Sequence, residues 1–310
     1  LFFVIISKSR YHLPLYRIQR HIFHESRILF TRSTMVSWLR YLFKSVRRIH
    51  YELLGEYKCS KVKHADESPI KVRLPDVSGR HHEGRMWVGI GRSSLCGPQT
   101  AVFYYDKSRS AAAALKFLKG SSPHDVLMTD GCQSYTKPVM KYSLTLLNCM
   151  AHARRKFKEA MDTGYKADYC KKLLRKIGQL YRLERFADKI DANIDKRFEL
   201  RQAYSKKILA EIKKLLLNPG FTVLPSRKTG EAINYMLNHW KPLTQYIESG
   251  LYPIDNNPVE RIIRTLVSSR RTTSCLSEKN TPFFLDYVFS SKAIRCHYGG
   301  FLCRQKASNW

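Results

Sequence analysis

The chain has 310 residues, of which 44% are hydrophobic and only 15 are Gly and 12 Pro, which excludes a disordered or fibrous protein and predicts one large or two ordinary globular domains. Its 55 Lys and Arg residues outnumber 25 Asp and Glu residues, so the formal net charge is +30. Such a surface repels itself unless it binds a polyanion, and nucleic acid is the polyanion we expect. A structural RNA-binding protein would carry the same charge and remains an alternative.

The eight cysteines form no CxxC pair, and we expect them to be reduced thiols of a cytosolic protein. The apolar run at residues 1–6 is followed at once by Lys8 and Arg10, so it is too short to span a bilayer and lacks the layout of a signal peptide. We therefore expect no membrane partner. Because the chain has no initiator Met, we also expect it to begin inside a longer protein.

Residues 1–58 form a basic segment that we expect to be helical. Between Tyr11 and Tyr57 it is rich in Arg and aromatic residues, and Ser33 or Thr34 would cap a helix that starts at Met35. A basic helical pair suits contact with DNA, but a packing arm with a solvated basic face has the same pattern.

Residues 59–152 read as the strand-rich part of an α/β core. Apolar residues alternate around Asp66, and two more strands follow at 86–90 and 100–105, which predicts an antiparallel meander. A helix at 110–118, a strand at 126–128 that ends at Asp130, and a strand at 143–149 come next. Asp66 on the first strand and Asp130 after the fourth could meet at one edge of the sheet.

The pattern from His152 to Asn218 is helical, and Asn218-Pro219-Gly220 ends it. We take 153–225 as a helical insertion, 226–275 as the C-terminal helical part of the core, and 276–310 as a divergent tail.

The last motif surrounds Glu260. Asn257 suits a helix N-cap, Pro258 the first helical position, and Glu260 the third, so Glu260 could be no more than the partner of a capping box. The order Asp, Asp, Glu on a first strand, after a fourth strand and on a later helix is nevertheless that of a ribonuclease-H-like core. Three converging carboxylates repel one another unless a hard cation such as Mg²⁺ lies between them.

Five motifs in this order resemble those of the transposases of the insertion-sequence family IS66, over most of the chain. They are Tyr11-His12-Leu13-Pro14-Leu15-Tyr16-Arg17, His64-Ala65-Asp66-Glu67-Ser68-Pro69, Thr129-Asp130-Gly131, Cys149-Met150-Ala151-His152-Ala153-Arg154-Arg155-Lys156-Phe157, and Asp255-Asn256-Asn257-Pro258-Val259-Glu260-Arg261. Relative to the family, the chain is expected to be truncated at its N-terminus. It also departs from the family's usual pattern from Arg270 onward.

The resemblance implies a DDE-type enzyme in which Asp66, Asp130 and Glu260 are catalytic and bind Mg²⁺ or Mn²⁺, as two ions. Its implied partners are double-stranded DNA with terminal inverted repeats, target DNA, and further copies of the chain on paired ends. The implied location is the bacterial cytoplasm, at the nucleoid. Two alternatives stay open: an inactive transposase remnant that only binds DNA, which the divergent tail motivates, and a ribonuclease-H-like nuclease without strand transfer.

Several basic residues follow the motifs closely, and we expect them to contact DNA phosphates, although a solvated basic helix start has the same pattern. They are Arg154, Arg155, Lys156, Arg261, Arg264, Arg270 and Arg271. Arg264 could instead pair with Glu260 one helical turn away.

Three neighbouring side chains have competing interpretations. Cys149 and His152 form half of a possible zinc site, but because no further ligands are evident we favour a buried thiol and a helix-start histidine. Asp255 could replace Glu260 as the third acid. Glu67 should point to the sheet face opposite Asp66.

Overall fold

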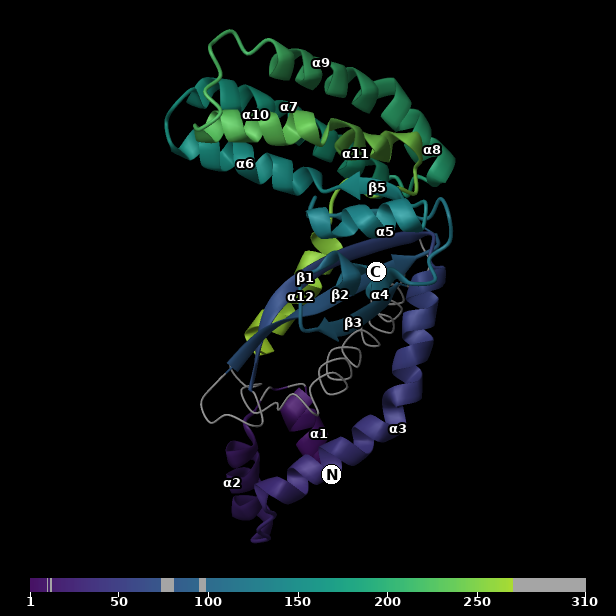
Figure 1. The fold of residues 1–310 in the computed structure, drawn as a ribbon, viewed down its shortest axis with the longest axis vertical. Helices are drawn as coiled ribbons and strands as arrows, with labels where there is room; N and C mark the ends of the chain where they lie inside the picture. Colours follow the sequence, from purple (N-terminus) through teal and green to yellow (C-terminus); the bar gives the residue numbers. More distant parts are fainter. Residues whose placement is uncertain (10, 12, 74–80, 95–98, 270–310) are drawn as a thin grey trace.

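A mixed five-stranded sheet flanked by helices forms the middle of the molecule (Figure 1). The computed structural model describes residues 1–269 except residues 10, 12, 74–80 and 95–98. The strands are β1 (Val62–Arg73), β2 (His81–Arg92), β3 (Thr100–Asp106), β4 (Val126–Thr129) and β5 (Thr145–Asn148). They lie in the order β3-β2-β1-β4-β5, with β1, β2 and β3 antiparallel and β4 and β5 parallel to β1. The predicted meander and both later strands are confirmed.

The register between β1 and β4 brings two of the predicted acids to one level. The parallel pairing runs from Val62 opposite Val126 to His64 opposite Met128. Asp66 and Asp130 each follow that last pair by two residues, so continuing the register places them side by side, on strands about 4.8 Å apart. Pairing with β4 is described only as far as His64, which explains how β1 accommodates Pro69, a residue without a backbone N–H.

The two faces of the sheet carry different helices because successive side chains of a strand point to opposite faces. Ile70, Val72 and Val88 pack with Val259 of α12 (Asn257–Ser269). On the other face, Ala65 and Trp87 pack against α4 (Ala111–Leu118), the 3-10 turn η1 (Gln133–Tyr135) and α5 (Thr136–Lys141).

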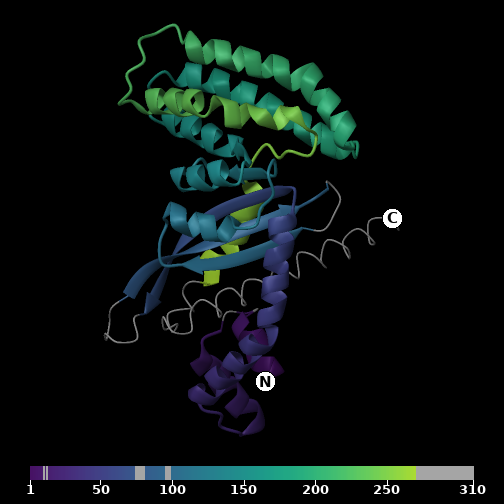
Figure 2. The same ribbon diagram turned by 45° about the vertical axis from the view of Figure 1, so that its right-hand side comes forward.

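Three N-terminal helices extend from the sheet, as Figures 1 and 2 show. They are α1 (Phe2–Ser9), α2 (Leu15–Ser26) and α3 (Arg32–Cys59). The predicted cap at Ser33 or Thr34 is wrong, because α3 begins earlier: Thr31 Oγ1 accepts the backbone N–H of Thr34 at 3.1 Å. At the other end of α3, Tyr57 is fully buried and stacks on Phe117.

A block of helices covers the end of the sheet that β5 occupies (Figure 1). It comprises α6 (Met150–Asp162), α7 (Ala167–Lys189), α8 (Ile194–Leu200), the π-helical turn η2 (Arg201–Ser205), α9 (Lys206–Leu217), α10 (Lys228–Asn238), α11 (Trp240–Thr244) and the 3-10 turn η3 (Gln245–Glu248). The helical prediction for 152–218 is confirmed. Helices α10 and α11, which the sequence places in the segment 226–275, share one apolar cluster with α6, α7 and α9.

Two arginines, of which Arg201 is buried, hold the segment before α12 in place. Arg201 is 2% exposed; its guanidinium donates to both carboxylate oxygens of Glu184 and to the backbone oxygens of Tyr246 and Ser249. Arg92, at the end of β2, donates to the backbone oxygen of Leu251 at 2.9 Å. These bonds hold the approach to α12 against both the block and the sheet. No helix in the described part of the chain is both long and apolar enough to cross a membrane.

Candidate active site

Asp66 lies near the middle of β1, on the face of the sheet that α12 covers. It follows His64 and Ala65, which are buried, whereas its own side chain is only partly buried. One carboxylate oxygen, Oδ1, accepts the backbone N–H of Glu67 at 2.8 Å. The second oxygen, Oδ2, is left for another ligand.

Asp130 follows β4 at a turn that Gly131 allows. Gly131 has a φ of +94°, a conformation that side chains with a Cβ rarely adopt, and a Cβ there would also lie 3.2 Å from Tyr235 Oη. The turn is closed by two bonds: Thr129 Oγ1 accepts the N–H of Gly131, and Asp130 Oδ1 accepts that of Cys132 at 2.9 Å. The hydroxyl of Tyr235, on α10, donates to the backbone oxygen of Asp130 at 3.0 Å.

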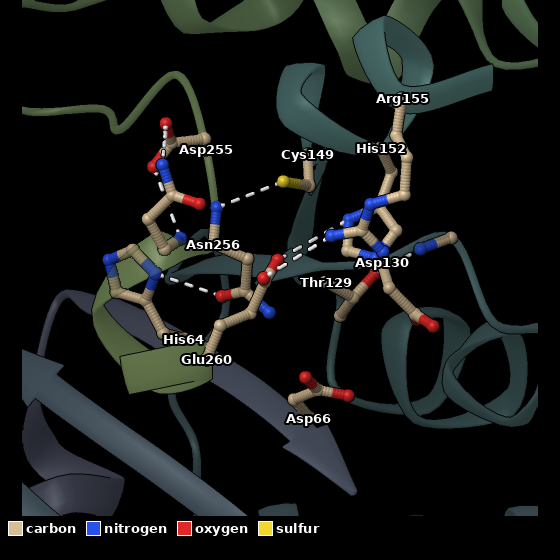
Figure 3. Close-up of polar contacts among 12 residues, drawn as sticks. His64, Asp66, Thr129, Asp130, Cys149, His152, Arg155, Asp255, Asn256 and Glu260 are labelled. Carbon is tan, nitrogen blue, oxygen red and sulfur yellow. Dashed lines mark hydrogen bonds and ion pairs between the residues drawn. The ribbon is translucent and has the colours of Figure 1, made fainter. Parts of the chain in front are cut away.

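The start of α12 differs in detail from the predicted cap. Asn257 is the first helical residue rather than the cap. The Asp255 carboxylate accepts two hydrogen bonds from Asn257, one from its backbone N–H at 3.1 Å and one from its side-chain amide at 2.6 Å. Asp255 is therefore engaged in shaping the helix start. The Glu260 side chain reaches α6 instead: its Oε1 lies 3.6 Å from His152 Nδ1, and its Oε2 accepts from Arg155 Nη2 at 3.5 Å (Figure 3). This geometry favours a role at the site over the capping-box interpretation.

Asn256 connects the start of α12 to β1 and to the start of α6, and sequence reasoning missed it. Its fully buried side chain bonds His64 Nδ1 through Oδ1 and donates to the backbone oxygen of Ala65 through Nδ2, both at 3.0 Å. Its backbone N–H donates to Cys149 Sγ at 3.1 Å (Figure 3). One residue thus fixes the start of α12 against β1 and against the start of α6. A polar residue beside the helix start was the only available signal, and it fits a cap equally well.

The electrostatics show that the acids share one environment. Burial, reinforced by the nearby carboxylate of Asp130, raises the pKa of Asp66 from 3.8 to about 8, with smaller contributions from Glu67 and Glu260. Desolvation disfavours a charged carboxylate, and like charges do so further. The charges of Asp130 and Glu260 therefore act on Asp66, and a cation bound between these carboxylates would relieve their repulsion.

Glu67 belongs to the other face of the sheet. Its carboxylate forms an ion pair with Arg109 and accepts a bond from Tyr135 Oη at 3.4 Å, beneath α4. Burial raises the pKa of Glu67, and the charge of Arg109 opposes that rise. These contacts agree with the expectation that Glu67 points away from Asp66.

Five of the seven predicted DNA-contact residues lie on α6 and α12, the two helices that the Arg155–Glu260 contact joins. Arg154 and Arg155 on α6 are exposed, and Lys156 Nζ lies 4.9 Å from the ring centroid of Tyr235. Arg261 and Arg264 are exposed on α12. Arg270 and Arg271 lie outside the described residues.

Comparison with known proteins identifies relatives over almost the whole chain. A sequence model of the family described as "Transposase IS66 family" matches residues 1–281. Two similar proteins of Sinorhizobium fredii (strain NBRC 101917 / NGR234) bear the names uncharacterized protein y4qI, 28% identical over 288 residues, and uncharacterized protein y4jD, 25% identical over 286 residues. The alignments cover 88% and 87% of this chain but 51% and 53% of those proteins. The chain thus spans about half the length of the curated relatives it matches.

Proposed function

This chain belongs to the transposase IS66 family, and on that premise we propose that it is a DDE-type transposase in which Asp66, Asp130 and Glu260 carry out metal-dependent cleavage and strand transfer at the ends of an insertion element. The observation that carries the proposal is the β1–β4 register, by which Asp66 and Asp130 lie level with each other, with Asp66 on the face of the sheet that α12 covers. The raised pKa of Asp66 supports it, because it arises from burial and from the charges of Asp130, Glu67 and Glu260. Carboxylates that lie close together repel one another, and this repulsion lowers the stability of the fold. A cation bound between them would offset that cost and would explain why they lie together.

The proposed fold of the catalytic part is a ribonuclease-H-like core. The five-stranded mixed sheet, with an Asp on its central strand and a second Asp after the neighbouring parallel strand, is compatible with it. Helix α12 supplies the glutamate from the face that Asp66 also occupies. The helical block would then be an insertion between the second and third acids.

The donor set suits a hard divalent cation. Asp66 and Asp130 each have one oxygen bonded to a backbone N–H, which orients the carboxylate and leaves the second oxygen for a ligand. Asp66, Asp130 and Glu260 would hold Mg²⁺ or Mn²⁺, and two such ions activate an attacking oxygen and stabilise a leaving oxygen in phosphodiester transfer. In this proposal water is the nucleophile for cleavage, and the freed DNA 3′ hydroxyl is the nucleophile for joining.

The basic helix starts would position the substrate. Arg154, Arg155 and Lys156 on α6, and Arg261 and Arg264 on α12, would neutralise phosphates on either side of the acids. Double-stranded DNA with terminal inverted repeats, target DNA and a second copy of the chain on the paired end are the proposed partners.

Cleavage of a duplex that carries the inverted repeat flanking the gene, with Mg²⁺, tests the proposal. We expect nicking by the chain and a loss in the Asp130→Asn variant larger than the roughly 10–100-fold that removal of an outer-shell group costs. Equal rates for the two proteins would refute catalysis and leave DNA binding alone. Cleavage without joined products on a target plasmid would point instead to a nuclease.

A further inference from the structure

Three potential metal ligands of two different helices converge beside the proposed catalytic acids. Cys149 Sγ, a ring nitrogen of His152 and a carboxylate oxygen of Glu260 all lie within 4.8 Å of one another. The sequence supplies Cys149 and His152 as a CxxH pair at the start of α6, and only the fold adds Glu260 from α12 (Figure 3).

Two polar atoms of these residues have no hydrogen-bond partner among the residues that the structure describes. His152 Nδ1 and Glu260 Oε1 are both buried and unsatisfied, although they lie only 3.6 Å apart. A buried polar atom without a partner is costly unless a ligand satisfies it. Their separation is close to the edge of a tetrahedron with metal bonds of about 2.0–2.1 Å, which is roughly 3.4 Å.

Two features of the Cys149 sulfur suit metal binding: its place at a helix N-terminus and the hydrogen bond that it accepts. Cys149 is fully buried at the N-cap of α6, where the helix dipole favours a negative charge. The Asn256 N–H that donates to Sγ at 3.1 Å is the kind of outer-shell bond that orients a metal-bound thiolate.

We propose that Cys149, His152 and Glu260 form a binding site for a borderline-soft divalent ion such as Zn²⁺, with a water molecule as the fourth ligand. Imidazole and thiolate suit this ion, whereas Mg²⁺ prefers oxygen ligands alone. Glu260 belongs to both sites, so Zn²⁺ bound here withdraws it from Asp66 and Asp130. This consequence, inhibition of Mg²⁺-dependent cleavage by Zn²⁺, rests on the proposed function; the binding itself does not.

Cobalt is the probe for the binding step, because tetrahedral Co²⁺ with a thiolate ligand has visible bands and a sulfur-to-metal charge-transfer band. The metal-free, fully reduced chain is titrated with Co²⁺ and then with Zn²⁺. We expect a tetrahedral spectrum that Zn²⁺ abolishes. The Cys149→Ser variant should lose the charge-transfer band, and His152→Asn and Glu260→Gln should bind Co²⁺ at least about 10–100-fold more weakly.

Cys170→Ser is the matched control, because Cys170 is equally buried but lies in the helical block beside Thr229. It should keep the full spectrum. Circular dichroism verifies the fold of every variant, and the partly exposed His152 provides a second test if Cys149→Ser does not fold. An unchanged charge-transfer band in folded Cys149→Ser, or unchanged affinity in His152→Asn, overturns the proposal.

A cleavage assay tests whether Glu260 is shared between the two metal sites. Zn²⁺ should inhibit the Mg²⁺-dependent reaction of the wild-type chain, and His152→Asn should need at least about tenfold more Zn²⁺ for the same fractional inhibition. If no cleavage is seen at all, the proposed function fails while the Co²⁺ titration still decides the metal site. If cleavage occurs and both proteins respond to Zn²⁺ alike, Glu260 is not shared.

Discussion

In the helical block the buried guanidinium of Arg201 bonds both carboxylate oxygens of Glu184 and two backbone carbonyls, whereas near the middle of β1 the carboxylate of Asp66 has the like charges of other acids nearby. Burying charge is costly in both places. The block pairs its buried charge with an opposite charge, whereas Asp66 has only a backbone N–H donor and like charges nearby. We therefore expect the paired charges of the helical block to stabilise the fold, and the acids near Asp66 to bind a ligand.

The largest expected effect comes from breaking the paired charges. Arg201→Met leaves Glu184 with the single partner Arg197 and removes the bonds to η3, so we expect a loss of about 3–5 kcal/mol in the free energy of unfolding. Urea denaturation measures it. Lys196→Met, which breaks the exposed pair with Glu199, is the control and should change little. If the two variants are equally stable, the Arg201 network is not a source of stability.

The second largest loss of stability is expected at Asn256, which joins the start of α12 to β1. Asn256→Leu leaves His64 Nδ1 and the Ala65 carbonyl without their partner, at a cost of about 1–3 kcal/mol for each buried group. Because Asn256 sets the position of α12, binding of Mn²⁺, followed by its electron paramagnetic resonance signal, should weaken in folded protein as well.

Asn193→Ala is the matched control for that variant. Asn193 caps α8 through the N–H of Lys196, so its loss should cost about 0.5–2 kcal/mol without any change in Mn²⁺ binding. Equal Mn²⁺ affinity in both variants would show that Asn256 does not position the acids.

The raised pKa of Asp66 predicts that the stability of the fold depends on pH. With its pKa raised to about 8 in the folded state, Asp66 binds a proton more tightly than in the unfolded chain, so it lowers stability progressively as pH rises from about 4 to about 8. In EDTA, Asp66→Asn should lose less of its melting temperature between pH 5 and 8, by several degrees at roughly 2–4 °C per kcal/mol. Parallel melting curves for the two proteins would argue against the raised pKa.

The smallest effect tests the contact between α10 and the turn after β4. Tyr235→Phe removes the bond to the Asp130 backbone and should cost about 0.5–1.5 kcal/mol. Tyr169→Phe removes a bond of equal length from the start of α7 to the backbone of Leu215 on α9, and should cost the same. Only Tyr235→Phe should slow cleavage; an equal effect on cleavage would remove any special role for the Tyr235 contact.

The sequence predicted much of the sheet because its signals are local. Alternation around Asp66, the short apolar run before Asp130 and the helical run at 110–118 each depend on a few neighbouring residues. The cap of α3 was misplaced because Thr31, Ser33 and Thr34 are chemically equivalent candidates, and local spacing does not choose among them. For the same reason the sequence left Glu260 between a capping box and a catalytic acid.

What the sequence determined by itself was the family, the order of the three acids and the basic charge, since these follow from residue identity and period alone. Only the tertiary structure decided which groups share a site. The β1–β4 register placed Asp66 level with Asp130, Asn256 bonded α12 to β1, and packing turned Glu260 toward His152 and beside Cys149. These contacts join residues more than a hundred positions apart in some cases, and such distances are set by packing rather than by any local pattern.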